Sequence, residues 1–380
     1  MLPLAGIKVI EFCQIAAGPF AGMLLADMGA DVIKVESPDG DGMRSWPPLC
    51  DGFSENFASL NRNKRSIVLD LKNKDDLARA RQLCLQSDVV LENFRPSVLS
   101  RLGLGYEELK KDRPELIYCS ISAFGQVGPR AREGGFDVTL QAVSGTMSVT
   151  GEADGAPVKC GVPVADFTAG LYAAFAVSSM LRRVEKEGVG GHVDVPMFGA
   201  MLGIAALQVS EYFGSGRDPK KLGSAHPRNA PYQAFRCADG YFVLAAGNND
   251  LFRRACEVAG LPELLANPRF ESPSLRAKHQ VELRESLEKV FVKLPSEIWL
   301  TRMRERGVPC APINTFSHAL ADEQVEHYGW VQPLELPGGR QTRTFKSPVR
   351  VPGLDFDVYR RPPALGEHTQ EIIAELTAAR

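Results

Sequence analysis

Ile7-Lys8-Val9-Ile10-Glu11-Phe12 opens a stretch, residues 7–36, in which two β-rich segments flank a helical one. Gly18-Pro19 marks the turn after the first segment, and a helix is expected from Phe20 to Met28, ending at Gly29. Asp31-Val32-Ile33-Lys34-Val35-Glu36 predicts a second strand. Strand, helix and strand in this order form a βαβ unit, whose crossover connection implies a parallel sheet.

The same alternation continues over the first ~200 residues, as α/β domains require. Further strands are expected at residues 66–71, 88–92, 116–122 and 192–197, and helices at 74–87, 168–183 and 198–213. The sequence therefore predicts an α/β fold with a doubly wound, parallel-sheet large domain over residues 1–220.

A smaller α+β domain is expected at residues 221–320, after the loop composition of Gly214-Ser215-Gly216-Arg217-Asp218-Pro219. It would begin with a hairpin-like pair at 234–237 and 239–245, followed by helices at 249–259, 275–294 and 296–306. Residues 321–380 are rich in Pro and Gly, which predicts a C-terminal segment with little structure of its own. A tail of this kind is expected to return to the large domain.

The overall composition argues against several classes of partner. A formal net charge of -2 over 380 residues gives no electrostatic footprint for nucleic acid or an anionic membrane. The longest apolar run, around residues 171–181, is shorter than a bilayer span, and residues 1–6 show no basic signal-peptide region. The eight cysteines form no CxxC pair, so neither a metal site nor a disulfide framework is expected. We expect a cytoplasmic protein without a membrane partner.

Asp166 is the first candidate for chemistry, within the stretch Gly161-Val162-Pro163-Val164-Ala165-Asp166-Phe167-Thr168-Ala169-Gly170. Gly and Pro punctuate the backbone there, and a largely apolar helical run follows from Thr168 to Arg183. Asp166 is therefore expected at or next to a helix N-terminus. It is either a capping residue, which the local sequence favours, or a catalytic carboxylate.

Two other segments carry polar groups beside expected strands. Asn61-Arg62-Asn63-Lys64-Arg65-Ser66, together with Lys72, is either a solvated surface loop or a clamp for phosphate groups. Glu92-Asn93-Phe94-Arg95-Pro96 ends the fourth strand, where open α/β sheets bind ligands, although Asn and Pro are also ordinary turn residues.

Common nucleotide and hydrolase motifs are absent from the sequence. The first βα turn reads Ala16-Ala17-Gly18-Pro19 rather than G-x-G-x-x-G, which argues against a nicotinamide dinucleotide site. Neither a G-x-S-x-G nucleophile elbow nor a Walker A sequence occurs.

A set of motifs spread in order along the whole chain resembles the class III CoA-transferases, which include formyl-CoA transferase. The motifs are Val9-Ile10-Glu11-Phe12, Ala17-Gly18-Pro19, residues 28–36, Asn63-Lys64-Arg65-Ser66, Leu69-Asp70-Leu71-Lys72, residues 92–96, Arg101-Leu102-Gly103, residues 118–125 and Gly366-Glu367-His368-Thr369.

This resemblance implies an enzyme that moves CoA from an acyl-CoA to a free carboxylic acid. In a G-x-x-x-x-D context, Asp166 matches the aspartate that carries the acyl group and forms an aspartyl anhydride and an aspartyl-CoA thioester. The resemblance also implies an interlocked homodimer and coenzyme A as a substrate, with no tightly bound cofactor. It places CoA near the residues Ala17, Leu69, Lys72, Asn93, Phe94 and Arg101.

The α-methylacyl-CoA racemases are the alternative, because they resemble this chain around Asp166 as well. They carry a proton-transferring His where this chain has Phe136, and a Glu near the segment Gly247-Asn248-Asn249, which has none. A phenyl ring cannot exchange a proton, so these departures disfavour a racemase or related isomerase.

The acceptor acid is expected to be a small dicarboxylate of the succinate, itaconate, glutarate or oxalate class. Ala16 stands where formyl-CoA transferase has a Gln, and Arg228 lies in the loop Pro227-Arg228-Asn229-Ala230-Pro231-Tyr232. Arg228 is expected either to bind the acceptor carboxylate, to pair with a CoA phosphate or to cap its loop.

Overall fold

A computed structural model describes residues 1–378 of the chain and divides it into two compact units. The first unit comprises Met1–Thr146, Lys159–Arg217 and Glu323–Arg380, and the second comprises Met147–Val158 and Asp218–Asp322. Residues 147–158 thus belong to the second unit, whereas the sequence placed all of 1–220 in the large domain. The C-terminal segment belongs to the first unit.

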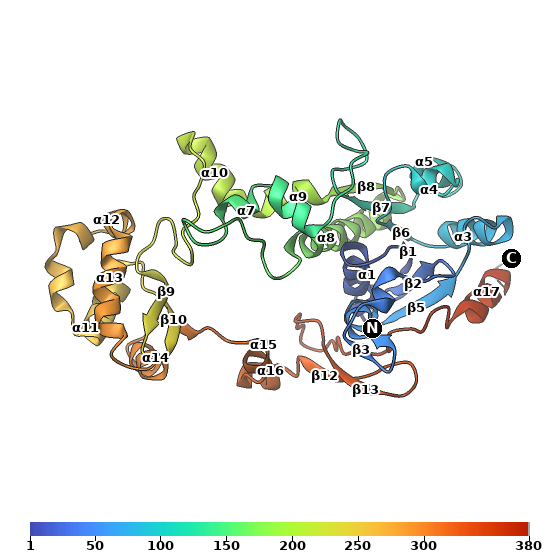
Figure 1. Cartoon of the computed structure of the whole chain (residues 1–380). Coiled ribbons are helices and arrows are strands. Elements are labelled where there is room, and N and C mark those ends of the chain that lie inside the picture. Colours follow the sequence, from blue (N-terminus) through green and yellow to red (C-terminus); the bar gives the residue numbers. More distant parts are fainter. Residues whose placement is uncertain (379–380) are drawn as a thin grey trace. The chain divides into compact units, whose positions relative to one another are not determined.

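A six-stranded parallel sheet forms the centre of the first unit, in the order β5-β2-β1-β6-β7-β8 (Figure 1). Every neighbouring pair in this sheet is parallel, which confirms the α/β class. The strands are β1 (Lys8–Phe12), β2 (Asp31–Glu36), β5 (Lys64–Val68), β6 (Val89–Glu92), β7 (Ile117–Ser122) and β8 (Gly191–Pro196).

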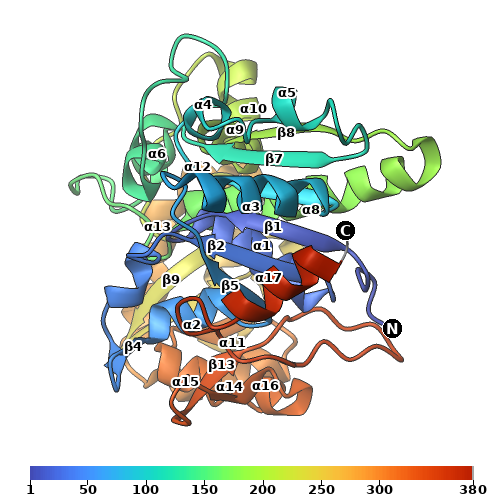
Figure 2. The same ribbon diagram turned by 90° about the vertical axis from the view of Figure 1, so that its right-hand side faces the viewer.

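Helices cover both faces of this sheet, because successive strand residues point to opposite sides. Val9 packs with α1 (Ala17–Asp27) and α8 (Val164–Glu187) on one face. Ile10 packs with α3 (Lys74–Leu85), α4 (Val98–Arg101), α5 (Tyr106–Leu109) and α17 (Thr369–Ala378) on the other. Figure 2 shows α17 lying along β5.

Three local expectations for the first unit were wrong. The strand expected at 66–71 is β5, which begins at Lys64, so two cations of the expected loop lie in the sheet. The single helix expected at 198–213 is divided at Ala205 into α9 (Met197–Ile204) and α10 (Ala206–Ser215). The C-terminal segment forms α16 (Glu323–Tyr328), a hairpin of β12 (Val331–Glu335) and β13 (Gln341–Phe345), and α17.

The long helix α8 has one buried and one exposed apolar side. Ala165, Ala169, Ala173 and Val177 are fully buried in the sheet core, whereas Phe175 is 71% exposed. This helix has 24 residues and an 18-residue window with a mean hydropathy of 1.4, which would suffice to cross a membrane by length and composition, whereas the sequence predicted only a shorter apolar run. A core helix of a globular unit passes the same criteria, so this feature carries little weight.

The second unit contains an antiparallel sheet of order β11-β10-β9 and a layer of helices. Its core gathers Phe235, Phe242, Phe291 and Trp299. The helix expected at 275–294 is interrupted at His279, because two shorter helices meet there. The elements are β9 (Tyr232–Cys237), β10 (Gly240–Ala245), α11 (Asn249–Ala259), α12 (Pro273–Lys278), α13 (Gln280–Phe291), α14 (Ser296–Glu305) and β11 (Cys310–Pro312).

Candidate active site

A cavity of about 510 Å³ lies in the first unit, near the carboxyl ends of β1, β6 and β7. Ligands bind in this position in open α/β sheets. Its wall is built by the loops after these strands, by the segment leading into α6 (Asp137–Val143) and by the first turns of α8 and α9. The lining residues are Gln14, Ile15, Ala16, Ala17, Asn93, Phe94, Arg95, Pro96, Ile121, Ser122, Ala123, Glu133, Gly134, Gly135, Phe136, Thr139, Asp166 and Met197.

Asp166 contributes a carboxylate to this cavity from the first turn of α8. The helix begins at Val164 after Pro163, so Asp166 is its third residue and does not cap it. The capping interpretation is therefore wrong. Within residues 1–378, the Asp166 carboxylate makes no hydrogen bond or ion pair, which leaves both oxygens available for reaction.

The surroundings of Asp166 disfavour its negative charge. Burial raises the pKa of Asp166 to about 7, and the nearby Asp137 carboxylate adds to the rise. Asp137 is held beside the first turn of α8, because it accepts hydrogen bonds from the Ala165 N–H at 2.8 Å and from Gln141 Nε2 at 2.7 Å. A carboxylate with a raised pKa is a more basic nucleophile when ionised.

The structure brings three of the six expected CoA-binding residues into the Asp166 cavity. Ala17, Asn93 and Phe94 line it. Leu69 is buried in the core on the α3 side of the sheet, and its side chain is 2% exposed. Lys72 and Arg101 are exposed residues that follow β5 and end α4, respectively.

Asn93 joins the loops that follow β1 and β6. Its Oδ1 accepts a hydrogen bond from the Gln14 N–H at 2.9 Å, and its Nδ2 donates to the Gln14 carbonyl at 2.9 Å. Phe94 is fixed in turn, because its N–H donates to the Glu92 carboxylate at 2.9 Å. Burial raises the pKa of Glu92 to about 7. The segment 92–94 thus forms a turn and a cavity wall at once.

The cationic stretch at residues 62–65 is neither a solvated loop nor a phosphate clamp. Arg62, Lys64 and Arg65 are at most 4% exposed. Arg62 pairs with Asp27 at 2.7 Å, Lys64 with Glu11 at 2.8 Å, and Arg65 with Asp31 and Glu371. Their carboxylate partners come from distant parts of the sequence, so the local charge pattern could not reveal them.

The sequence analysis did not predict several of the residues that line the cavity as functional residues. Ile15 gave no signal, and Arg95 was noted only within its motif, although it brings a cation to the wall. Phe136, which stands where racemases carry a histidine, also lines the cavity. Arg228 belongs to the second unit, where its N–H donates to His226 Nδ1 at 3.1 Å. Over the described residues 1–378, no group of three or more His, Cys, Asp or Glu could hold a metal ion.

The sequence of this chain is similar to a known protein family and to several named enzymes. The family model described as CoA-transferase family III matches residues 4–369. A relative from Agrobacterium fabrum named succinate–glutarate CoA-transferase is 41% identical, over 98% of this chain and 96% of that protein. A Homo sapiens relative named succinyl-CoA:glutarate CoA-transferase is 38% identical, over 98% and 86%.

A third relative is named for a different carboxylic acid, oxalate. The acetyl-CoA:oxalate CoA-transferase of Acetobacter aceti is 36% identical, over 99% of this chain and 96% of that protein. Among solved structures, a CAIB/BAIF family protein from Brucella suis superposes with a TM-score of 0.88 at 40% identity and covers 99% of both chains.

Proposed function

This chain belongs to CoA-transferase family III, and from this premise we propose that it transfers CoA from an acyl-CoA to a small dicarboxylic acid through a covalent intermediate on Asp166. The observation that carries the proposal is the position of Asp166, an unpaired carboxylate of raised pKa on the wall of a large cavity. Three residues expected to contact CoA line the same cavity, which supports the assignment.

The proposed reaction proceeds through four acyl transfers, two that form the aspartyl-CoA thioester and two that consume it. An Asp166 oxygen attacks the thioester carbonyl carbon, the C–S bond breaks, and a mixed anhydride and the CoA thiolate form. The thiolate then attacks the Asp166 carbonyl carbon, which releases the donor carboxylate and leaves an aspartyl-CoA thioester. The acceptor carboxylate attacks this thioester, and the thiolate attacks the resulting anhydride at the acceptor's acyl carbon. The products are the new thioester and a free Asp166.

A single nucleophile suffices for this sequence, because one thioester is exchanged for another of nearly equal energy. Covalent catalysis divides the exchange into easier steps. The attacking oxygen must be ionised, and the high pKa of Asp166 keeps its ionised form basic at neutral pH. Neither a general base nor an external energy source is required.

Racemisation is the weaker alternative, because it needs two groups that exchange protons with the α-carbon. Phe136 cannot serve as the second group. Glu133 lines the cavity, but its carboxylate accepts a hydrogen bond from Arg130 at 2.7 Å, and this bond lowers the pKa of Glu133. Exchange of deuterium into the α-carbon of acyl-CoA would reveal a racemase.

The acceptor class is inferred from the charge of two arginines and from the relatives. The relatives are named for succinate, glutarate and oxalate, all of which carry two carboxylates. A guanidinium binds a carboxylate through two parallel hydrogen bonds. Arg228 of the second unit remains our candidate for this contact, and Arg95 on the cavity wall is the alternative within the first unit.

We further propose that Lys72 and Arg101 bind the phosphates of CoA, since both present exposed charge after strands of the parallel sheet. Leu69 would act through packing beneath that site rather than through direct contact.

We propose that two copies of the chain form an interlocked homodimer. Large apolar side chains are exposed on three successive helices of the first unit, and apolar surface of this kind marks protein interfaces. They are Leu171, Tyr172 and Phe175 on α8, Leu202 and Ile204 on α9, and Leu207, Tyr212 and Phe213 on α10.

Substitution and trapping test the nucleophile. Asp166→Ala should abolish transfer while acyl-CoA still binds, whereas Asp39→Ala, at an exposed aspartate, should leave turnover unchanged. Hydroxylamine added together with acyl-CoA should convert Asp166 alone into a hydroxamate, detectable by peptide mass spectrometry. Wild-type turnover in Asp166→Ala, or a hydroxamate at another carboxylate, would refute the proposal.

A further inference from the structure

The loop between β1 and α1 is held in place from beneath by buried side chains. Lys34 Nζ donates to the Cys13 carbonyl at 2.7 Å, and Lys64 Nζ donates to the Pro19 carbonyl at 2.8 Å. The Ile15 N–H lies 3.1 and 3.2 Å from the two carboxylate oxygens of Asp41. Because Gln14, Ile15, Ala16 and Ala17 line the Asp166 cavity, these contacts set the shape of its wall.

Ile15 adopts a backbone conformation that its own side chain disfavours. Its φ is 66°, in the left-handed region, and among residues 1–378 it is the single β-branched residue with a positive φ. A β-branched residue there is an outlier, and such strain persists only where the surroundings impose it. Strained backbone clusters at functional sites, and Ile15 lines the same cavity as Asp166.

Asp41 is the group that imposes this conformation. Its carboxylate also accepts the Met43 N–H at 2.9 Å and lies 2.9 Å from Lys34 Nζ. Glu11 accompanies the two lysines, and all four charged side chains are at most 2% exposed. Burying four charges is costly, so these pairs are weak candidates for stabilising the fold as such. None of the four takes part in the proposed chemistry.

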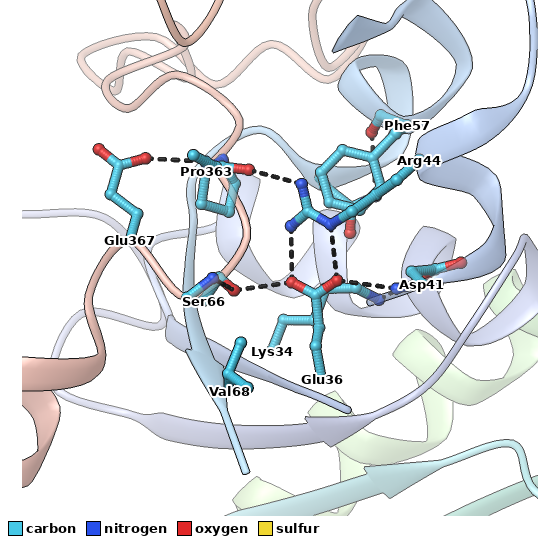
Figure 3. A network of polar contacts seen from close by, with 12 residues as sticks. Lys34, Glu36, Asp41, Arg44, Phe57, Ser66, Val68, Pro363 and Glu367 are labelled. Carbon is cyan, nitrogen blue, oxygen red and sulfur yellow. Dashed lines mark hydrogen bonds and ion pairs between the residues drawn. The ribbon is translucent and has the colours of Figure 1, made fainter. Parts of the chain in front are cut away.

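A second contact network fixes Asp41 itself (Figure 3). The Asp41 N–H donates to Glu36 at 3.0 Å, and Arg44 binds the same carboxylate through Nε at 2.8 Å and Nη2 at 2.6 Å. Arg44 also donates to the Pro363 carbonyl at 3.1 Å and stacks over the Phe57 ring. Asp41 is thus anchored on both its backbone and its side chain, as a positioning group requires.

We propose that Asp41 is a positioning residue for CoA transfer: by binding the Ile15 N–H it holds Ile15 in the left-handed conformation and thereby fixes part of the wall of the cavity that Asp166 lines. The inference rests on the proposed function of Asp166, and it assigns to Asp41 no contact with substrate. Without this anchor Ile15 relaxes toward negative φ, the segment 14–17 shifts, and the reacting end of the acyl-CoA loses its alignment.

Two truncations of Ile15 separate backbone conformation from side-chain contacts. Ile15→Ala and Ile15→Gly both remove the side chain, but only Gly adopts a positive φ without strain. With Asp41 intact, the two variants should differ in kcat by less than about twofold, because Asp41 holds either residue in place. In the Asp41→Ala background, which removes the acceptor of the Ile15 N–H, Ile15→Gly should exceed Ile15→Ala in kcat by about tenfold, with KM for acyl-CoA changed less.

Asp41→Glu provides a second background in case Asp41→Ala fails to fold. Glu keeps the charge beside Lys34, but its longer chain moves the carboxylate away from the Ile15 N–H, so the same tenfold ratio is expected. Asp27→Ala is the matched control, since Asp27 is a buried carboxylate that pairs with Arg62 and does not touch the loop. It should lower the melting temperature and leave the ratio below about twofold.

The outcomes distinguish this inference from the proposed function on which it rests. An equal Gly-to-Ala ratio in the Asp41, Asp41→Ala and Asp41→Glu backgrounds would overturn the role of Asp41, even if Asp166→Ala is inactive. Persistent turnover in Asp166→Ala would overturn the nucleophile instead. A crystal structure of Asp41→Ala in which Ile15 keeps its φ of 66° would also contradict the inference.

Discussion

Replacing Asp166 by Asn should make the folded protein more stable, and the gain should grow as the pH rises. Folding moves the Asp166 carboxyl from water into a cavity that disfavours its charge, raising its pKa from 3.8 to about 7. Between these two values the folded state binds a proton that the unfolded state has released, so wild-type stability declines with rising pH. An amide of the same shape does not titrate and escapes this penalty.

The expected magnitude follows from the size of the shift. A difference of about three pKa units, at about 1.4 kcal/mol per unit, corresponds to a penalty of about 4 kcal/mol once both states are ionised. At pH 5 the folded state is still protonated, and the penalty is only about 2 kcal/mol. These are upper limits, because Asp166 is only partly buried and solvent reduces the cost of its charge.

Urea unfolding followed by circular dichroism measures this difference. Wild type and Asp166→Asn are compared at pH 5, 6, 7 and 8, at one protein concentration, because association shifts the apparent stability. Mass spectrometry confirms that the amide has not hydrolysed, and Asp39→Asn supplies the exposed control. A gain that is equal at pH 5 and pH 8, or an Asp166→Asn variant less stable than wild type at pH 8, would refute the reasoning.

Four further outcomes are expected. The acid limb of kcat/KM should have its midpoint near pH 7, and Asp137→Asn should move it to lower pH by removing a neighbouring negative charge. Lys72→Ala and Arg101→Ala should raise KM for acyl-CoA more than they lower kcat, with a smaller effect at high salt. Arg228→Lys and Arg228→Ala should raise KM for succinate more than for acetate. Phe175→Asp should shift the sedimentation coefficient from dimer to monomer, because it places a charge on the exposed side of α8.

A control variant or a contradicting result can be named for each of these outcomes. Lys111→Ala, at an exposed lysine after α5, should leave KM for acyl-CoA unchanged. Arg95→Ala tests the other candidate for the acceptor contact, and a selective loss of succinate affinity there but not in Arg228→Ala would reassign the contact. An unaltered pH profile in Asp137→Asn would exclude electrostatic coupling to Asp166. A dimer that survives Phe175→Asp would locate the interface elsewhere.

The order of elements in the first unit could be predicted, because hydrophobic periodicity reports on burial at each position. The segment Asp31–Glu36 is a strand with the expected bounds, and Asn249–Ala259 is a helix with the expected bounds. The break at Ala205 could not be predicted, since residues 198–207 around it are all apolar. Periodicity is silent where every residue is apolar.

The candidate site could be predicted only in part from the sequence, because contacts between distant segments decide the roles of its residues. Asp166 and Asn93 were found through short motifs. The strained Ile15 has no local signal, because Asp41 imposes its conformation from 26 residues away. Arg65 shows the same limit. Its partner Glu371 is 306 residues further along the chain, so the local sequence predicted a charged loop residue where the structure has a buried strand residue.

The return of the C-terminal segment to the first unit has a consequence for biosynthesis. Ile372 and Leu376 belong to the core beside Ile10, so the sheet that begins at residue 8 lacks part of its cover until residues 372–376 have been synthesised. At a translation rate of about 5–20 residues per second, the first strands wait roughly 20–70 s for that cover. A nonsense codon before position 372 would remove this cover from the core around Ile10 and from the edge strand β5.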